Sequence, residues 1–177
     1  MKIIIGLGNP GEKYQNNRHN VGKLFIDYFI SGLINWQVSE LKEKNKIVAK
    51  IFKNNSLILA KSEEFMNLSG KIVKKIIKNY KLKIKNLYIV HDDLDIPLGK
   101  FKIQLSQGPK LHNGIKSIEE ALKTKNFWRI RIGVDARKKE NWIDGETYVL
   151  QNLLPEEKEI LQNQVFPKIF EKIKNLK

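Results

Sequence analysis

The feature that most restricts the possible folds of this chain is a short apolar run that leads into a glycine-rich polar loop. Ile3 to Ile5 have the character of a buried strand, and Asn9-Pro10-Gly11 is a strong turn signal directly after them. Apolar residues recur at helical spacing only from about residue 20 onward. In open α/β sheets, ligands bind where such a strand ends. We therefore expect the functional site in the stretch from Gly6 to Gly22.

Three glycines of this stretch also match the G-x-G-x-x-G pattern of dinucleotide-binding loops: Gly6, Gly8 and Gly11. In that pattern the helix begins within the glycines, so that its N–H groups meet a pyrophosphate. Here Pro10 and a polar stretch intervene, and the later acidic residue, Asp27, lies inside the predicted helix rather than at a strand end. A nucleotide-binding function is therefore an alternative that the sequence disfavours.

Strand and helix patterns alternate along the rest of the chain. The patterns predict strands over 36–39, 46–52, 57–61, 87–90, 100–105 and 127–134, and helices over 20–32, 65–80, 112–122 and 155–177. Pro167 is expected to kink or divide the last helix. We find no repeat or linker that would separate a second domain. The sequence thus predicts one three-layer α/β domain over 1–177, with a central mixed, mostly parallel sheet flanked by helices, and with region 155–177 packed on or beside the site.

The charge of the chain suggests a polyanionic partner but does not require one. Lys and Arg number 33 against 19 Asp and Glu, which gives a formal net charge of +14. Clustered Lys and Arg bind phosphates with release of counterions, as in nucleic-acid-binding proteins. A codon bias towards A and T would also enrich Lys, Asn and Ile, so charge alone leaves both interpretations open.

Two absences narrow the class of protein. The chain has no cysteine among its 177 residues, which excludes disulfides, thiol catalysis and cysteine-ligated zinc. It also has no apolar run of transmembrane length and no signal-peptide pattern. We therefore expect a cytoplasmic protein with no membrane partner.

The reactive side chains are few. Neither a G-x-S-x-G nor an H-E-x-x-H motif occurs, so a hydrolase with this sequence would activate water directly. The 3 histidines, His19, His91 and His112, each fall at a predicted strand end or helix start, and histidine suits a general base near neutral pH. They lack metal-ligand spacing such as i, i+4, so no metal site is expected. The structural alternative for each is a helix cap or a buried hydrogen bond, which we favour for His91.

Asparagines stand at the tips of the same loops. Asn9, Asn67 and Asn113 each offer both a donor and an acceptor without adding charge. Any one of them alone is more often a cap or turn residue. Together with a histidine and an acid, they indicate a polar site that holds a carbonyl group or a water molecule.

Several motifs, in this order, closely resemble the bacterial peptidyl-tRNA hydrolase family: GLGNPGEKYQNNRHNVG, FMNLSG, HDDLD, HNGIKSI and FWRIRIG. The resemblance runs from Met1 to about Val149. It implies hydrolysis of the ester bond between a peptide and the terminal ribose of tRNA, which recycles tRNA from stalled or dropped-off translation. It also implies a monomer that needs no metal or cofactor.

Residue roles follow from the resemblance by position. His19 is expected to be the general base, and Asp92 to orient its ring and stabilise the imidazolium. Asn9 is expected to distinguish a blocked amino group from a free one. A helix N-terminus should lower the pKa of His19 while Asp92 raises it, which leaves a pKa near neutral.

The implied binding residues fall into two groups. The first holds the peptide, the water or the substrate near the tRNA end and comprises Asn67, Asn113, Tyr14 and Phe65. Lys102 and Arg131 form the second and are expected to contact tRNA phosphates. The family usually carries a glycine-rich run before HNG, whereas this chain has Ser106 to Leu111 there. An alternative of another class is a catalytically weak RNA-binding module on the same scaffold.

Overall fold

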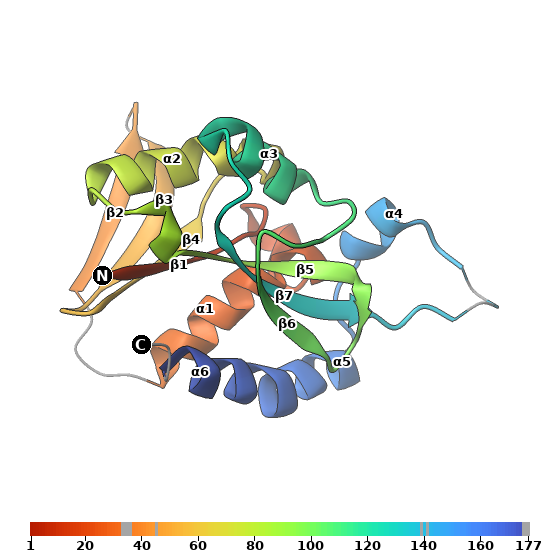
Figure 1. The fold of residues 1–177 in the computed structure, drawn as a ribbon. Coiled ribbons are helices and arrows are strands. Elements are labelled where there is room, and N and C mark those ends of the chain that lie inside the picture. The colour runs from red at the N-terminus through yellow and green to blue at the C-terminus, as the bar shows by residue number, and fades with distance from the viewer. Residues whose placement is uncertain (33–36, 45, 139, 141, 175–177) are drawn as a thin grey trace.

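The computed structural model describes residues 1–32, 37–44, 46–138, 140 and 142–174 (Figure 1). These residues form a 7-stranded sheet with the order β2-β3-β4-β1-β5-β7-β6. The strands are β1 (Lys2–Gly6), β2 (Gln37–Glu43), β3 (Lys46–Lys53), β4 (Leu57–Ser62), β5 (Leu87–Pro97), β6 (Phe101–Leu105) and β7 (Trp128–Asp135). The α-helices are α1 (Val21–Ser31), α2 (Ser69–Asn79), α3 (Asn113–Leu122), α4 (Gly145–Val149), α5 (Pro155–Ile160) and α6 (Phe166–Lys174).

The sheet is mixed, and its parallel part is central. β4, β1, β5 and β7 pair in parallel, whereas β2, β3 and β6 pair antiparallel at the two sides. The predicted α/β class with a mixed sheet is confirmed. The sheet is partly rather than mostly parallel, because three of its six strand pairings are parallel and three are antiparallel. β1 and β5 are therefore neighbouring central strands, and their carboxyl ends lie side by side. Residues that follow these two strand ends can share one site.

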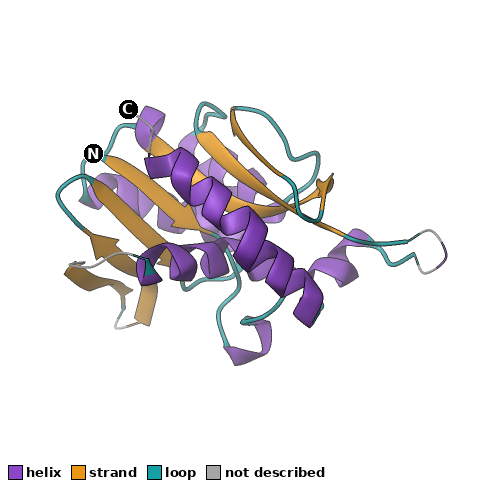
Figure 2. Cartoon of the chain, turned by 90° about the horizontal axis from the view of Figure 1, so that it is seen from below, coloured by secondary structure: helices purple, strands orange, loops and turns teal. Residues whose placement is uncertain are grey.

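Helices cover both faces of the sheet and complete three layers (Figures 1 and 2). Ile3 and Ile5 point into the core under α2 and α3, and Ile4 points to the opposite face, against α1 and α6. This alternation follows from the period of two in a strand. A parallel strand covered on both sides is apolar throughout, which is why Ile3 to Ile5 are consecutive isoleucines.

The central strand β5 is longer than the apolar pattern indicated. The predicted strand ends at residue 90, but β5 continues to Pro97, and Asp92 and Asp93 pair in register with Ile132 and Gly133 of β7. Charged residues are tolerated inside this ladder because other side chains neutralise them, as described below. The acids therefore belong to the strand rather than to a loop beyond it. The predicted start of the second strand, Trp36, lies outside the described residues.

The C-terminal helical region is interrupted just before Pro167. A π-helical turn, Leu161–Val165, separates α5 from α6, which starts at Phe166. The backbone stays helical from Pro155 to Lys174, so Pro167 lies inside a continuous helix and removes one of its backbone hydrogen bonds. The sequence predicts that Pro167 kinks or divides the last helix. The structure has the π-helical turn Leu161–Val165 just before it.

The two glycines that flank the loop allow α1 to lie directly on the sheet. A Cβ atom on Gly6 would lie 2.3 Å from the Gly22 carbonyl oxygen, and one on Gly22 would lie 2.3 Å from the Val90 carbonyl oxygen. Both contacts are with backbone, which cannot move aside as a side chain can. Packing therefore explains glycine at both positions.

Replacing Gly22 by alanine is expected to destabilise the fold by about 1 to 3 kcal/mol, because α1 must move away from β5. Chemical denaturation would measure the change. Gly32→Ala is the matched control, since the nearest atom of the described residues to its added Cβ is 3.9 Å away. Equal stability of the Gly22→Ala variant and the wild type would contradict this close approach.

Candidate active site

The loop between β1 and α1 is closed by a pair of asparagines. The Asn9 N–H donates to Asn20 Oδ1 at 2.8 Å, and Asn20 Nδ2 donates to the Asn9 carbonyl at 2.9 Å. Asn20 is 3% exposed, so these bonds are buried. Asn20 was not among the predicted site residues, although its position beside His19 in the same loop was the available signal. It fixes the backbone that carries Asn9.

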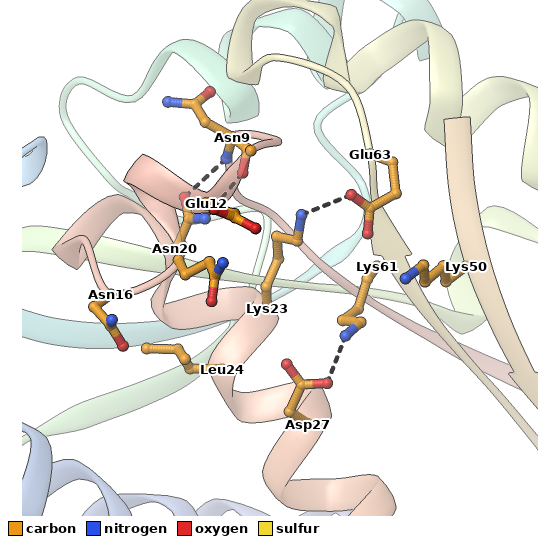
Figure 3. A pocket seen from close by; sticks show the side chains of 12 residues that line it. Asn9, Glu12, Asn16, Asn20, Lys23, Leu24, Asp27, Lys50, Lys61 and Glu63 are labelled. Atoms are coloured by element: carbon orange, nitrogen blue, oxygen red, sulfur yellow. Dashed lines mark hydrogen bonds and ion pairs between the residues drawn. The ribbon is translucent and has the colours of Figure 1, made fainter. Parts of the chain in front are cut away.

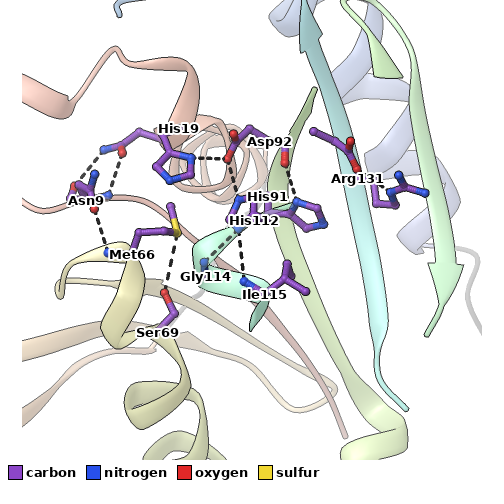
Figure 4. Close-up of polar contacts among 12 residues, drawn as sticks. Asn9, His19, Met66, Ser69, His91, Asp92, His112, Gly114, Ile115 and Arg131 are labelled. Carbon is purple, nitrogen blue, oxygen red and sulfur yellow. Dashed lines mark hydrogen bonds and ion pairs between the residues drawn. The ribbon is translucent and has the colours of Figure 1, made fainter. Parts of the chain in front are cut away.

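Two histidines meet on one carboxylate at the centre of the candidate site (Figure 4). His19 Nδ1 lies 2.8 Å from Asp92 Oδ1, and His112 Nε2 lies 2.9 Å from the same oxygen. His19 comes from the 3₁₀ turn before α1, Asp92 from β5, and His112 caps the N-terminus of α3. The predicted neighbours His19 and Asp92 are thus brought together, and His112 joins them.

Hydrogen bonding fixes the tautomers of these two rings. His112 Nδ1 accepts the N–H groups of Gly114 and Ile115 at 3.1 and 3.2 Å, so its proton must be on Nε2, directed at Asp92. His19 correspondingly donates Nδ1–H to Asp92, which leaves the lone pair on its Nε2. That nitrogen has no hydrogen-bond partner among the described residues. Of the two rings, only that of His19 has a free basic nitrogen.

Charge and burial act in opposite directions on these groups. Burial lowers the pKa of His19, but the charge of Asp92 and its hydrogen bond outweigh burial and raise that pKa above the usual 6.5. Burial would raise the pKa of Asp92, yet His19 and His112 hold it far below its usual range. Asp92 is therefore a carboxylate at neutral pH. The opposing influence on His19 is burial, in place of the helix dipole that the sequence suggested.

His91 occupies the core behind this site. It is 0% exposed, and its Nδ1 lies 2.6 Å from the Asp92 carbonyl oxygen. Burial, followed by the charge of His112, lowers the pKa of His91 well below 6.5. A neutral, buried ring cannot reach a substrate. The structural role favoured for His91 agrees with this placement.

Asn9 presents a defined end of its amide to the site. Its Oδ1 accepts the Met66 N–H at 2.9 Å, which leaves Nδ2 as the free donor (Figure 4). Asn67, in the 3₁₀ turn before α2, and Asn113, at the start of α3, are exposed, and their side-chain amides make no hydrogen bond with the described residues. These amides are therefore available to a ligand.

An aromatic pair stands beside these asparagines. The rings of Tyr14 and Phe65 meet edge to face, with centroids 6.4 Å apart, and Phe65 is 47% exposed. The two acids before Phe65, Glu63 and Glu64, add little net negative charge near the site. Glu63 pairs with Lys23 at 3.1 Å and Glu64 with Lys46 at 2.8 Å, so nearby lysines compensate both.

The two predicted phosphate contacts differ in accessibility. Lys102 is exposed on the edge strand β6, in register with Arg131 of β7. The side chain of Arg131 is only 9% exposed, and its guanidinium bonds Asp93 at 2.6 Å and Gln104 at 2.8 Å. Arg131 is therefore the internal counter-ion of a β5 carboxylate. Sequence reasoning recognised its charge but had no signal for its burial.

The loop Ser106 to Leu111 is held down by two arginines. The Arg129 guanidinium donates to the Gly108 carbonyl, and a Cβ on Gly108 would lie 2.1 Å from the Arg131 guanidinium. The Lys110 N–H also bonds Asp95 at 2.8 Å. This loop leads into His112, and its Leu111 side chain is 94% exposed.

A buried ion pair joins the C-terminal region to the loop. Arg18, next to His19, meets Glu157 of α5 at 2.6 Å, and the two side chains are 4% and 5% exposed. Glu157 also accepts the Leu154 N–H at 2.8 Å. α5 therefore lies beside the candidate site, while α6 packs across α1.

Replacing Glu157 by glutamine is expected to lower the free energy of unfolding by about 3 to 5 kcal/mol, because the Arg18 charge is left buried without compensation. Denaturation of this variant beside Glu156→Gln, an exposed neighbour on α5, would measure the difference. A similar decrease in the free energy of unfolding in the two variants would contradict the predicted stabilisation by the Arg18–Glu157 ion pair.

The same central residues are also a possible metal-ligand set. One ligand atom each from His19, Asp92 and His112 lies within 4.8 Å of the others. A metal ion there would replace the two N–H···O bonds that set the tautomers. The hydrogen-bonded arrangement and metal ligation are therefore mutually exclusive at this carboxylate.

Comparison with known proteins assigns the family. The sequence model of the family described as Peptidyl-tRNA hydrolase matches residues 3–176. A peptidyl-tRNA hydrolase of Sulfurihydrogenibium sp. is 42% identical over 91% of this chain and 83% of that protein. One of Phytoplasma mali is 36% identical over 99% of this chain and 97% of that protein.

A solved structure agrees with the sequence matches. The crystal structure of peptidyl-tRNA hydrolase from Acinetobacter baumannii superposes with a TM-score of 0.81 and 27% identity, covering 98% of this chain and 87% of that one. Within the described ranges, no helix is both long and apolar enough to cross a membrane. The resemblance inferred from the motifs is confirmed: the chain belongs to the peptidyl-tRNA hydrolase family.

Proposed function

We propose that this chain hydrolyses the ester of peptidyl-tRNA with a water molecule activated by His19, and that the reaction recycles tRNA from stalled or dropped-off translation. The observation that carries this mechanism is the bond of 2.8 Å from His19 Nδ1 to Asp92, which leaves Nε2 free as a base. An ester is easier to hydrolyse than an amide, so a positioned water suffices without a covalent nucleophile.

In the proposed reaction, Nε2 of His19 removes a proton as the water oxygen attacks the ester carbonyl carbon. The carbonyl becomes an oxyanion in a tetrahedral intermediate, and Asp92 stabilises the imidazolium that has formed. Collapse of the intermediate expels the ribose 3′ oxygen, which takes the proton back from Nε2. The peptide leaves as a carboxylic acid, and the base is regenerated.

Amide donors near the base would bind the substrate acyl group. Asn9 Nδ2 attracts the carbonyl oxygen of an N-acyl group and repels a free ammonium, because it can only donate. This property supports its role in selecting blocked amino groups. Asn67 and Asn113 are proposed to hold the peptide, the water or the oxyanion through their side-chain amides.

The proposed contacts to tRNA come from two parts of the molecule, the loops after β1 and β4 and the edge strand β6. Tyr14 and Phe65 offer an aromatic surface on which a terminal base can stack. Lys102 is free to meet a phosphate on the exposed edge strand, and Arg131 balances Asp93 beneath it. The binding partner is therefore the acceptor end and the phosphate backbone of peptidyl-tRNA.

The proposal extends to the oligomeric state, the cofactor requirement and the cellular location of the protein. We propose that the protein acts as a monomer formed by a single domain over 1–177, as the resemblance of its motifs implies. His19 and Asp92 need no metal or cofactor for this reaction. Because peptidyl-tRNA arises during translation, we place the activity in the cytoplasm.

The mechanism predicts strong selection for a blocked amino group. Wild-type protein is expected to cleave N-acetyl-aminoacyl-tRNA at least about tenfold faster than the unblocked ester, because a free ammonium loses the Asn9 hydrogen bond. Release of tRNA from the two substrates would be compared under single-turnover conditions. Tight, salt-dependent tRNA binding without cleavage of either ester would favour the RNA-binding module instead.

A further inference from the structure

The outer side of α2 is lined by lysines. The helix reads SGKIVKKIIKN, which includes four lysines and no acidic residue. Its buried residues face the core at helical spacing, so the lysines project from the opposite side. The proposed mechanism makes no use of them. We call this set the α2 lysine face, and it comprises Lys71, Lys74, Lys75 and Lys78.

The lysines of this face repel one another when no ligand is bound. Two pairs are spaced i, i+4, Lys71 with Lys75 and Lys74 with Lys78. Like charges at this spacing destabilise a helix. Lys71 also stands in the first turn of α2, where the helix dipole disfavours a cation. An anionic partner bound along this side of the helix would relieve both effects.

Acidic side chains compensate only part of the α2 lysine face. Glu43 of β2 lies 3.0 Å from Lys71 and 4.0 Å from Lys75, so one carboxylate serves two ammonium groups. Lys74 and Lys78 are exposed and form no ion pair among the described residues. The face therefore keeps a net positive charge that the protein itself does not neutralise.

Lysines on the α1 side of the sheet show that neighbouring lysines in this protein can be paired with acids. Lys23 lies 3.1 Å from Glu63, and Lys61 lies 2.5 Å from Asp27 (Figure 3). A codon bias towards A and T would raise the number of lysines throughout the chain, and it does not exclude acids beside them. The lack of acids in α2 is therefore a separate feature of this helix.

The α2 lysine face begins next to the candidate active site. Helix α2 starts two residues after Asn67, whose carbonyl accepts a hydrogen bond from Ser117 Oγ of α3 at 2.8 Å. The same oxygen accepts the Gly70 N–H at 3.0 Å. These bonds join the start of α2 to α3 and to a residue that is proposed to bind substrate. A ligand held at Asn67 is therefore close to the first lysine of the face.

Lys102, the proposed phosphate contact, lies on the same side of the sheet as α2. Ile130 and Ile132 of β7 belong to the core on the α1 and α6 side. Arg131 between them therefore points to the opposite side, which α2 and α3 cover (Figure 1). Lys102 is paired directly opposite Arg131 and points the same way. A tRNA that contacts Lys102 and extends past α3 therefore meets the α2 lysine face.

We propose that the α2 lysine face binds phosphates of the double-stranded part of the tRNA, beyond the acceptor end that the active site holds. The inference rests on the proposed function and extends the tRNA contacts to a second surface. A nucleic-acid duplex carries about one negative charge per 1.7 Å of its axis, and lysines that neutralise phosphates release the condensed counterions. Such contacts carry no sequence information, so the face can serve every tRNA.

The dimensions of the helix suit several phosphates at once. From Lys71 to Lys78 the helix advances by about 10 Å, at roughly 1.5 Å per residue. Phosphates along one strand of a duplex follow at about 3.4 Å of axis each. The face is therefore long enough for more than one lysine to contact the same strand, and Lys74 and Lys78 are its two uncompensated members.

The first test measures the salt dependence of binding of uncharged tRNA by wild type and by the double variant Lys74→Gln, Lys78→Gln. Each phosphate contact contributes about 0.9 to the slope of log affinity against log salt concentration, so the slope should fall by about 2. Affinity at about 0.1 M salt should fall at least about tenfold. Thermal stability should stay equal or rise, because a repulsive pair is removed.

The double variant Lys168→Gln, Lys172→Gln is the matched control. Both lysines are exposed on α6, on the other side of the sheet, with the same i, i+4 spacing and the same change in net charge. The control should keep the wild-type slope. An unchanged slope in the α2 variant, as expected of a merely solvated face or of one that binds a protein, would overturn the inference. So would an equal fall in the control.

The second test compares hydrolysis of N-acetyl-aminoacyl-tRNA with that of the same ester on the terminal trinucleotide, which has no double-stranded part. In the α2 variant, kcat/KM for the full tRNA should fall about tenfold through KM, while that for the trinucleotide ester should stay at the wild-type value. An equal loss with both substrates would contradict the inference. Failure of the wild type to cleave either ester would overturn the proposed function instead, and the salt slope with uncharged tRNA would still decide the role of α2.

Discussion

Replacing His19 by alanine is expected to lower kcat for N-acetyl-aminoacyl-tRNA by about 10² to 10⁴-fold, the usual contribution of a general base. His112 cannot substitute, because backbone N–H groups occupy its Nδ1 and its Nε2 carries the proton. His91 is buried and neutral. Single-turnover hydrolysis at saturating enzyme would isolate this loss from any change in binding.

The His19→Ala variant should keep its fold and its affinity for tRNA, since the side chain makes its polar contact with Asp92 alone among the described residues. Thermal unfolding and salt-dependent binding of uncharged tRNA provide these controls. Retention of more than a tenth of the wild-type rate by a folded variant would exclude His19 as the base.

Exchange of Asp92 for asparagine is expected to reduce kcat by roughly 10²-fold or more and to move the acidic limb of the pH profile. In the wild type, Asp92 raises the pKa of His19 above 6.5, so kcat/KM should increase with pH through that raised pKa. Without the carboxylate, burial is left to lower the pKa, and the limb should move to lower pH. An asparagine amide can also donate to Nδ1, which places the ring proton on the catalytic Nε2.

The neighbouring exchange Asp93→Asn distinguishes this effect from general disturbance of β5. Asp93 pairs with Arg131 at 2.6 Å, and among the described residues no hydrogen bond or ion pair joins it to His19. Its variant is expected to lose stability and to keep the wild-type position of the acidic limb. A limb that moves equally in both variants, or in neither, would contradict the assigned role of Asp92.

Local patterns predicted the unit that carries the site. Ile3 to Ile5, the turn after them and the delayed start of α1 are consequences of neighbours in sequence, so the loop could be located without coordinates. As the sequence predicts, no α-helix begins within the glycine pattern, and the packing of α1 on the sheet explains Gly6 and Gly22. Family motifs supplied the roles of His19 and Asp92, which local patterns alone could not assign.

Long-range contacts account for what the sequence did not reveal. His112 reads as a residue at a helix start, and only the position of α3 against β5 brings its second nitrogen to Asp92. The burial of Arg131 likewise depends on β6 lying beside β7, which provides Gln104. Strand β5 continues beyond its apolar residues because histidine and arginine side chains on other elements neutralise its acids. Such contacts depend on tertiary geometry, which a single sequence does not display.

The ion pair between Arg18 and Glu157 also bears on the order in which the molecule matures during its own synthesis. The Arg18 N–H bonds the Gln151 carbonyl, and the Leu153 N–H bonds the Asn16 carbonyl, so the loop that holds His19 is anchored over a long sequence separation. A ribosome-bound chain that stops short of residue 150 lacks all these anchors. The residues that hold the catalytic loop in place are thus translated late, and the nascent polypeptide completes this region only after most of the sheet has been made.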